Sequence, residues 1–291
     1  AGQEVAVTET STSFYNERQK VEIDLTKSLE VDEDYGVGNN GEIFDVSFGL
    51  YAAEELTAAD GTTIPADGLI EVITLDENGH GKAVSDLPMG SYYVQEISNN
   101  AAYLKNETKY PVVFEYAGQE TAVVSITANE GEAIENDLIY GAVSGKKSDE
   151  DGNALGGALI GIFKTGTEEF TTETAIATTT SEDDGSFSFA KVPYGNWIIR
   201  EIESPTGYVL SDEEIPVTIS KVDEVVEIEL VNEFITGSIE LTKVDEDYPD
   251  NKLTGAVFEV YADKNGDGKL DDGDELLGEM GELGDGVYQM S

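Results

Sequence analysis

Three asparagines in this chain are each followed, eleven positions later, by a lysine, and this repeat limits the possible folds more than any other feature. The pairs are Asn16 and Lys27, Asn136 and Lys147, and Asn232 and Lys243. A pattern that returns in one register indicates tandem copies of a single structural unit. We expect each pair to mark a joint, where the last strand of one domain runs into the first strand of the next.

The lysines and asparagines of the repeat fall where apolar side chains belong. Side chains on a β-strand alternate between its two faces, so residues i, i+2 and i+4 share a face. Lys147 rather than its neighbour Lys146 falls on the apolar face. The apolar residues in phase are Val21, Ile23 and Leu25 for Lys27; Val143 for Lys147; Ile239 and Leu241 for Lys243; Phe14 for Asn16; Ile134 for Asn136; and Val226, Ile228 and Leu230 for Asn232.

One glutamate in each repeat follows the same rule. Glu96 is in phase with Val94, and Glu201 is in phase with Ile199. Each glutamate lies six residues after the glycine of a Pro-X-Gly turn and fifteen residues before a proline that opens another strand. The sequence therefore predicts a core-facing Lys, Glu and Asn in each complete repeat.

Three buried polar groups of this kind are unfavourable unless they pair or react. An unpaired buried charge costs several kcal/mol even after relaxation. One solution is a buried ion pair with an amide partner. The other is a reaction, because burial lowers the pKa of lysine and raises that of glutamate, so that both approach their neutral forms. A neutral amine is a nucleophile, and a protonated glutamate can donate to the Asn oxygen and pass protons to leaving ammonia, which yields a Lys–Asn amide without buried charge.

Four segments carry a recognisable family pattern: Gly237–Asp245, Leu253–Tyr261, Gly90–Glu96 and Leu230–Asn232. They resemble the Cna protein B-type (prealbumin-like) domains of Gram-positive surface proteins. The resemblance covers nearly the whole chain and implies an all-β fold of tandem Ig-like, prealbumin-like β-sandwiches. It also implies an autocatalytic isopeptide bond in each complete domain, from the triads Lys27, Glu96 and Asn136, and Lys147, Glu201 and Asn232. The second domain departs from the family pattern, because Gly145-Lys146-Lys147 replaces Leu-Thr-Lys.

The repeats divide the chain into two complete domains and two partial ones. We expect residues 1–20 to be the terminal strands of a preceding domain, 21–138 and 139–236 to be complete sandwiches, and 237–291 to be the first half of a third. Asn16 and Lys243 are then the unpaired triad members of the partial domains. Fragment boundaries explain this most simply; the alternative is completion between molecules, in which another copy adds a strand.

The net charge of −45 is the most extreme feature of the composition. It argues against nucleic acids and anionic membranes as partners, and it suits cation binding. The chain has no cysteine, so disulfides, thiolate metal sites and cysteine nucleophiles are excluded. No apolar run approaches the roughly 18–20 residues that span a bilayer. We find neither a signal peptide nor a sorting motif, and we expect the chain to be a piece of a longer secreted protein of a Gram-positive cell wall.

An acidic segment near the C-terminus has the spacing of a calcium-binding loop. Oxygen ligands fall at positions 1, 3, 5, 7, 9 and 12 of the loop pattern, and glycine stands at position 6. Position 12 is aspartate rather than glutamate, and the flanks read as strands. An acidic turn that binds no ion is the alternative, and Ca²⁺ is the only cofactor we expect. The residues of this candidate loop are Asp263, Asn265, Asp267, Lys269 (through its carbonyl), Asp271, Asp274 and Glu275.

These observations predict a structural function: the stalk of a Gram-positive surface adhesin or a pilus-like shaft. It is not an enzyme, because each triad reacts once. Neighbouring repeats are the expected partners. One alternative is an adhesive module that binds host matrix protein or glycan through its long loops, around Glu30–Gly41 and Leu56–Gly68, although solvated loops are the simpler expectation. Another is an accessory module of a secreted enzyme assembly.

Overall fold

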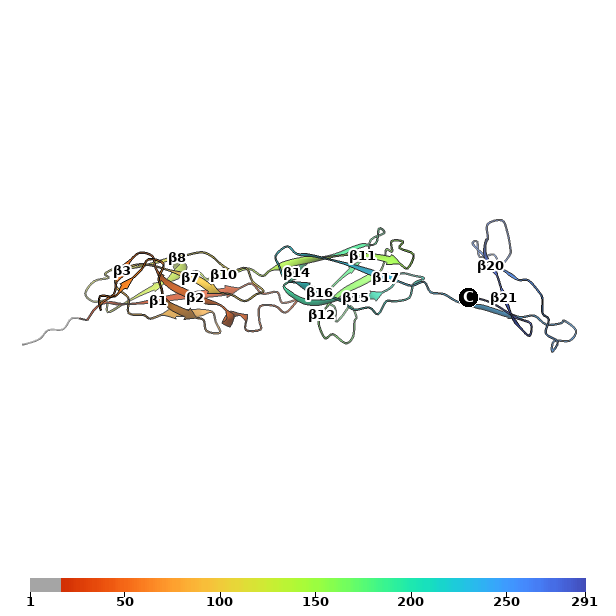
Figure 1. The fold of residues 1–291 in the computed structure, drawn as a ribbon, viewed down its shortest axis with the longest axis horizontal. Helices are drawn as coiled ribbons and strands as arrows, with labels where there is room; N and C mark the ends of the chain where they lie inside the picture. Colours follow the sequence, from red (N-terminus) through yellow and green to blue (C-terminus); the bar gives the residue numbers. More distant parts are fainter. Residues whose placement is uncertain (1–16) are drawn as a thin grey trace, which may run out of the picture.

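The computed structural model describes residues 17–291, and its regular structure is almost entirely β-strand (Figure 1). Two short 3₁₀ turns, η1 (Glu42–Asp45) and η2 (Ala128–Gly131), are the helical elements of this part of the chain. Neither has the length or apolar character needed to cross a membrane. The predicted all-β fold is confirmed, and Figure 1 shows two sandwiches in line along the long axis, followed by a separate C-terminal segment.

The first sandwich holds ten strands. One sheet has the order β10-β1-β6, with β9 also paired to β1, and the facing sheet has the order β5-β2-β7-β8. β3 and β4 form a separate hairpin. The strands are β1 (Lys20–Leu29), β2 (Ser47–Ala52), β3 (Leu56–Thr57), β4 (Thr63–Ile64), β5 (Leu69–Thr74), β6 (His80–Ala83), β7 (Gly90–Ser98), β8 (Tyr110–Phe114), β9 (Val123–Thr127) and β10 (Ile134–Asn136).

The second sandwich repeats this plan with seven strands. Its sheets have the orders β14-β11-β17 and β13-β12-β15-β16. The strands are β11 (Tyr140–Asp149), β12 (Leu159–Lys164), β13 (Ala177–Thr180), β14 (Ser186–Pro193), β15 (Gly195–Glu203), β16 (Ile215–Ile219) and β17 (Val225–Asn232).

In both sandwiches the first and last strands lie side by side and run parallel. β1 pairs with β9 and then with β10, which are the two halves of a last strand that η2 interrupts. β11 pairs with an uninterrupted β17. The chain therefore enters and leaves each sandwich on adjacent strands, and a pull on the two ends loads the hydrogen bonds between those strands in shear.

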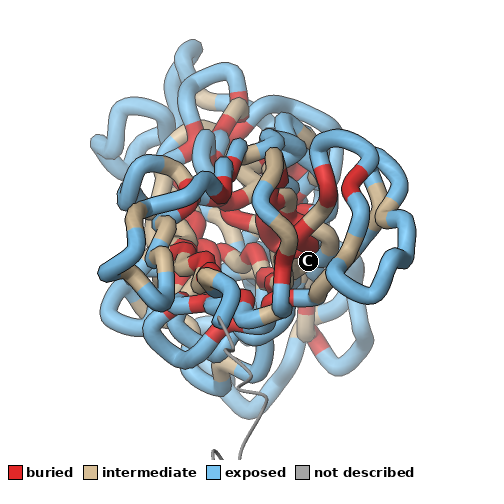
Figure 2. Tube along the Cα trace, turned by 90° about the vertical axis from the view of Figure 1, so that its left-hand side faces the viewer, coloured by how far each residue is buried: buried red, intermediate tan, exposed pale blue. Residues whose placement is uncertain are grey.

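Each sandwich encloses its own apolar core between its two sheets. The alternation on β1 places Val21, Ile23 and Leu25 inside, all at 3% exposure or less. Viewed along the long axis, the buried residues lie in the interior and the exposed residues form the rim (Figure 2). Each core is thus continuous with the face of the first strand that carries the repeat lysine.

The C-terminal segment (residues 237–291) has a thinner core. Tyr288 is fully buried, but Val257 is 71% exposed and Leu283 is 64% exposed. β18 pairs with β22, which pairs with β21, and β19 pairs with β20. The strands are β18 (Ile239–Thr242), β19 (Glu259–Ala262), β20 (Glu275–Glu279), β21 (Gly281–Gly284) and β22 (Val287–Met290).

The extra loop of the first sandwich connects the two sandwiches. This segment, which we call the strap (residues 30–41), leaves the end of β1 and places Tyr35 in the core of the second sandwich, against Trp197. Tyr35 is only 9% exposed. The expectation that this loop is simply solvated is therefore wrong, because its aromatic side chain finds an apolar site on the neighbouring domain.

Polar contacts hold the base of the strap. The carboxylate of Glu30 accepts hydrogen bonds from the backbone N–H of Leu138 at 2.9 Å and from the hydroxyl of Tyr140 at 3.2 Å. Lys191, from the second sandwich, lies 3.8 Å from Glu30 and 4.0 Å from the ring centroid of Tyr140. A small cluster of Ala102, Tyr103 and Leu138 packs against Val37 of the strap and against Tyr140. The two sandwiches therefore meet through a packed joint.

Candidate functional site

The first triad is brought together inside the first sandwich. Lys27 comes from β1, Glu96 from β7 in the facing sheet, and Asn136 from the end of β10, and their exposures are 2%, 2% and 3%. Lys27 stands opposite Ile134 in the parallel register, so Asn136 lies two residues farther along on the same face. The Lys27 amine donates to the carbonyl of Ile134 at 2.9 Å and to that of Ser28 at 2.7 Å. The amine thus lies against the strand that carries the carboxamide.

Glu96 and Asn136 are hydrogen-bonded directly. Asn136 Nδ2 donates to both carboxylate oxygens of Glu96, at 3.1 and 2.9 Å, and also to Asn99 Oδ1 at 3.0 Å. The backbone N–H of Asn106 donates to Glu96 Oε1 at 3.4 Å. Asn136 Oδ1 is buried without a hydrogen-bond partner. The glutamate therefore faces the nitrogen of the carboxamide, whereas the sequence analysis expected it to face the oxygen.

The second triad has the same arrangement. Lys147, Glu201 and Asn232 are each 1% exposed, while Lys146 points to solvent. Lys147 Nζ lies 3.9 Å from Glu201 Oε1, and both side chains are fully buried. Lys147 also donates to the carbonyl of Leu230 at 3.3 Å, the residue opposite it in the parallel register.

The carboxamide of Asn232 is held as tightly as that of Asn136. Asn232 Nδ2 donates to Glu201 Oε2 and to the backbone carbonyl of Val209, each at 2.6 Å. The backbone N–H of Ser211 donates to Glu201 Oε2 at 3.0 Å. Glu201 Oε1 and Asn232 Oδ1 are buried and accept no hydrogen bond. Unpaired buried acceptors are costly and rare in folded proteins, which makes this network unusual for a purely structural core.

Burial shifts the pKa values of Lys27, Glu96 and Lys147 toward the neutral forms. Desolvation lowers the pKa of Lys27 to about 8, despite the opposing attraction of Glu96. Desolvation likewise raises the pKa of Glu96, against the hydrogen bond from Asn136 and the charge of Lys27. The pKa of Lys147 is lowered for the same reason. Amide formation requires a nucleophilic amine, and a lowered pKa makes the buried lysine one. It also requires a carboxamide within reach, and here that carboxamide is hydrogen-bonded to a carboxyl group.

Tight glycine turns hold the lysine strands. The N–H of Lys27 donates to the carbonyl of Gly79 at 2.8 Å, and that of Lys147 donates to Gly185 at 2.7 Å. Both glycines have φ +76°, and a Cβ on either would collide with the carbonyl oxygen of the lysine it clamps. Glycine is required here both for the left-handed backbone and for the close approach.

The partial repeats supply no complete triad within residues 17–291. Lys243 follows β18, is half-buried, and has its N–H bound to Gly286 at 2.7 Å, as in the complete sandwiches. In the second sandwich the first strand, β11, has the last strand, β17, on one side and β14 on the other. In the described part of the chain β18 pairs only with β22, so its other side has no described strand. Asn16 lies outside the described residues.

The acidic loop near the C-terminus is formed but turns its carboxylates to the backbone. Asp263 accepts from the N–H groups of Gly266 and Gly268, each at 2.7 Å, and Asp274 accepts from that of Asp271 at 2.9 Å. Glu275 pairs with Lys264 at 2.9 Å. Across residues 17–291 no three acidic or histidine side chains gather as a metal-holding group. Asp263, Asn265, Asp267, Lys269, Asp271, Asp274 and Glu275 remain a predicted calcium site.

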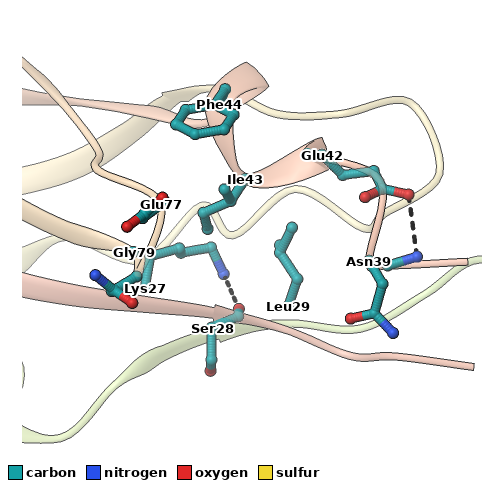
Figure 3. Close-up of a pocket in the computed structure, with 12 residues that line it drawn as sticks. Lys27, Ser28, Leu29, Asn39, Glu42, Ile43, Phe44, Glu77 and Gly79 are labelled. Atoms are coloured by element: carbon teal, nitrogen blue, oxygen red, sulfur yellow. Dashed lines mark hydrogen bonds between the residues drawn. The ribbon is translucent and has the colours of Figure 1, made fainter.

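A shallow cleft of about 470 Å³ lies beside the first triad. Leu29 of β1, Ile43 and Phe44 of η1, and the turn at Gly79 line it (Figure 3). Glu42 accepts from the N–H of Gly38 at 3.0 Å, which ties the end of the strap to η1. The strap residues Gly38, Asn39 and Gly41 also line this cleft.

Sequence reasoning missed the groups around each triad. Asn99 and the N–H groups of Asn106 and Ser211 were not predicted, because they lie in the turns that follow the glutamate strands rather than on strands with a clear period. One signal was present: Asn106 and Ser211 each stand ten residues after the triad glutamate.

Several solved structures are similar to this chain, and one of them, with a TM-score above 0.5, shares its fold. The TIE protein of Bacillus anthracis is 18% identical with a TM-score of 0.59, over 94% of this chain and 43% of that one. The C-terminal fragment of the pilus adhesin SpaC from Lactobacillus rhamnosus GG is 12% identical with a TM-score of 0.45, over 75% and 98%. The minor pilin GBS52 of Streptococcus agalactiae is 17% identical with a TM-score of 0.30, over 76% and 98%. This chain thus spans less than half of the Bacillus protein.

A search of curated protein sequences gives no match. The family model of the SpaA prealbumin-like fold domain matches residues 34–130 and 141–233, which together are more than half of the chain. The second match includes the whole triad of Lys147, Glu201 and Asn232, whereas the first contains Glu96 but ends before Asn136. The chain belongs to the SpaA prealbumin-like fold domain family, and it carries two copies of that domain in tandem.

Proposed function

We propose that this chain is a load-bearing stalk section of a Gram-positive surface adhesin or pilus-like protein, in which a Lys–Asn isopeptide bond closes each sandwich. The observation that carries the proposal is the position of the triads. Lys27 and Asn136, and likewise Lys147 and Asn232, lie on adjacent parallel strands where the chain enters and leaves each sandwich. A covalent bond at this point carries tension past the hydrogen-bond ladder of the sandwich.

The reaction needs only the groups of the triad. Neutral Lys27 Nζ attacks Asn136 Cγ, the Cγ–Nδ2 bond breaks, and ammonia leaves. The carboxyl group of Glu96 accepts a hydrogen bond from Asn136 Nδ2 at 2.9 Å. It gives a proton to this leaving nitrogen and takes one from Lys27 Nζ. Glu96 ends protonated, as it began, and a neutral amide takes the place of the buried amine and carboxamide. Each site turns over once, so the chain is not an enzyme in the usual sense.

The bond also stabilises the fold. If the loop-entropy estimate for disulfides is applied, closing loops of this length contributes about 4–5 kcal/mol for each bond. This is large beside the ordinary stability of a domain, about 5–15 kcal/mol. A chain without cysteine has no disulfide to serve this purpose.

The stalk function also implies where the protein is located and which partners it has. The protein is extracellular and attached to the cell wall, and its partners are neighbouring repeats or subunits of the same kind. The adhesive alternative is weakened for the strap, because Tyr35 is buried against the second sandwich and is not free to meet a ligand. The hairpin of β3 and β4 and its flanking residues are the long loop that adhesion could still use.

Single-molecule stretching tests the proposal. In the native chain the residues between Lys27 and Asn136, and between Lys147 and Asn232, do not extend under load. Glu96→Ala prevents the first bond, so one sandwich then unfolds with a stepwise gain in length while the other stays closed. If the native chain shows the same two unfolding steps as a Glu96→Ala, Glu201→Ala double variant, the stalk mechanism is wrong.

A further inference from the structure

Asn136 is held from two sides, and one of these contacts lies outside the triad. Its Nδ2 donates to Glu96 and also to Asn99 Oδ1, at 3.0 Å. Asn99 is itself oriented, because its Nδ2 donates to the carbonyl of Tyr103 at 2.9 Å. That bond turns the oxygen of Asn99 toward Asn136. Only the NH₂ edge of the Asn136 carboxamide, a donor, can face an acceptor there.

The second sandwich has the same turn but a different residue in it. Ser204 follows Glu201 by three residues, as Asn99 follows Glu96, and its hydroxyl donates to the carbonyl of Tyr208 at 3.0 Å. No hydrogen bond in the described residues joins Ser204 to Asn232. Instead the second hydrogen of Asn232 Nδ2 goes to the main-chain carbonyl of Val209, at 2.6 Å. Both sandwiches thus give the asparagine NH₂ a second acceptor, from a side chain in one and from the main chain in the other.

We propose that Asn99 is a positioning residue for isopeptide formation in the first sandwich. The inference rests on the proposed function and adds a residue to it. With its NH₂ group shared between Glu96 and Asn99, Asn136 presents the leaving nitrogen to the acid that must protonate it. Without Asn99 the carboxamide of Asn136 can rotate by half a turn, so that its oxygen rather than its nitrogen faces Glu96. The fraction of molecules with the leaving nitrogen next to the acid then falls.

The substitution Asn99→Ser separates positioning from structure. Serine keeps the turn contact that Ser204 makes in the second sandwich, and it removes the acceptor for Asn136. The chain is made by cell-free synthesis, and samples are taken over time for denaturing mass spectrometry. The measured quantity is the rate at which the peptides of Lys27 and Asn136 become joined with loss of ammonia. We expect this rate to fall roughly tenfold, consistent with the loss of one hydrogen bond, while the bond in the second sandwich forms as before.

Two controls complete the test. Ser204→Ala should leave the rate of bond formation in the second sandwich unchanged. In a Lys27→Met background, where no bond can form in the first sandwich, Asn99→Ser should lower the thermal unfolding midpoint by no more than the loss of one hydrogen bond, so that the sandwich stays folded at the temperature of the rate measurement.

The outcomes distinguish the two proposals. If Asn99→Ser forms the first bond as fast as the native chain, or if the first sandwich of the Lys27→Met, Asn99→Ser variant is unfolded at the temperature of the rate measurement, the positioning role is wrong. If the native chain itself never joins Lys27 to Asn136, it is the proposed function that fails.

Discussion

The ring of Tyr35 meets the indole of Trp197 edge-on, with centroids 4.8 Å apart and an interplanar angle of 76°. The two residues belong to different sandwiches, and their contact is the centre of the joint between them. Edge-to-face aromatic pairs contribute stabilisation beyond the apolar area they bury. The contact therefore resists separation of the two sandwiches, as the proposed stalk requires.

Removing this ring should loosen the joint measurably. We expect Tyr35→Ala to destabilise the second sandwich by roughly 3–5 kcal/mol, as for other buried aromatic side chains. Trp197 is the only tryptophan of the chain, so its fluorescence reports on this site alone. The variant should show red-shifted emission and a lower denaturant midpoint.

The C-terminal segment offers a matched control for the strap. The pentapeptide Val-Asp-Glu-Asp-Tyr occurs at residues 31–35 and again at 244–248, where Tyr248 is 72% exposed. Tyr248→Ala should change stability by less than about 0.5 kcal/mol. Equal effects of the two substitutions on stability would contradict the claim that Tyr35 of the strap stabilises the second sandwich.

The glycine that clamps each lysine should be intolerant of a side chain. We expect Gly185→Ala to destabilise the second sandwich and to slow its bond, because a Cβ would push Lys147 away from Asn232. Gly152 has a similar φ of +83° but open space around it, so Gly152→Ala measures the backbone strain alone. Strain costs about 1 kcal/mol. The thermal unfolding midpoint of Gly185→Ala should be well below that of Gly152→Ala. Equal midpoints would show that the close approach of Gly185 to Lys147 does not matter for stability.

Bond formation in the first sandwich should depend on pH in a predictable direction. The neutral pair of Lys27 amine and Glu96 acid carries the same number of protons as the ion pair, so the rate is flat between the two pKa values. It falls as pH rises above about 8, because the lowered pKa of Lys27 lets the pair lose its last proton. It also falls in acid, below the raised pKa of Glu96, because Lys27 is then protonated along with the acid.

The chain is made by cell-free synthesis and folded at a series of pH values. Mass spectrometry of the joined peptides then gives the rate of bond formation as a function of pH. A rate that keeps rising to pH 10 would show that Glu96 takes no part as an acid.

Calcium binding is a separate prediction for the C-terminal segment. The loop from Asp263 to Glu275 should bind one Ca²⁺ with a dissociation constant on the order of 10⁻⁴–10⁻³ M, as extracellular modules do. Binding requires Asp263 and Asp274 to exchange their backbone N–H partners for the ion. Isothermal titration should show a single site that Asp263→Ala removes and Asp250→Ala, outside the loop, retains. No binding heat in the native chain would identify the loop as an acidic turn.

Much of this structure follows from strand parity. The alternation of apolar residues on β1 predicts that Lys27 points inward, and the side chain is 2% exposed. The same rule selects Lys147 over Lys146, because a shift of one residue reverses the face. These positions depend only on local backbone geometry and on the need to bury one face of a sheet.

The remaining features depend on contacts that no local pattern encodes. Tyr35 sits in an acidic loop without strand periodicity, and its burial is decided by an apolar site on another domain. Asn99 lies in a turn, where its role depends on the distance to Asn136 across the sandwich. The orientation of the Asn136 carboxamide, with its nitrogen toward Glu96, likewise follows from the surrounding hydrogen bonds.

The most direct test of the central claim is the intact mass of the denatured native chain. If both bonds form, the chain loses two ammonia molecules relative to the sequence, and the peptide digest shows Lys27 joined to Asn136 and Lys147 joined to Asn232. Glu201→Ala should retain the first loss and abolish the second. A mass equal to that of the unmodified sequence would contradict the account, and would leave two sandwiches with unreacted buried ion networks.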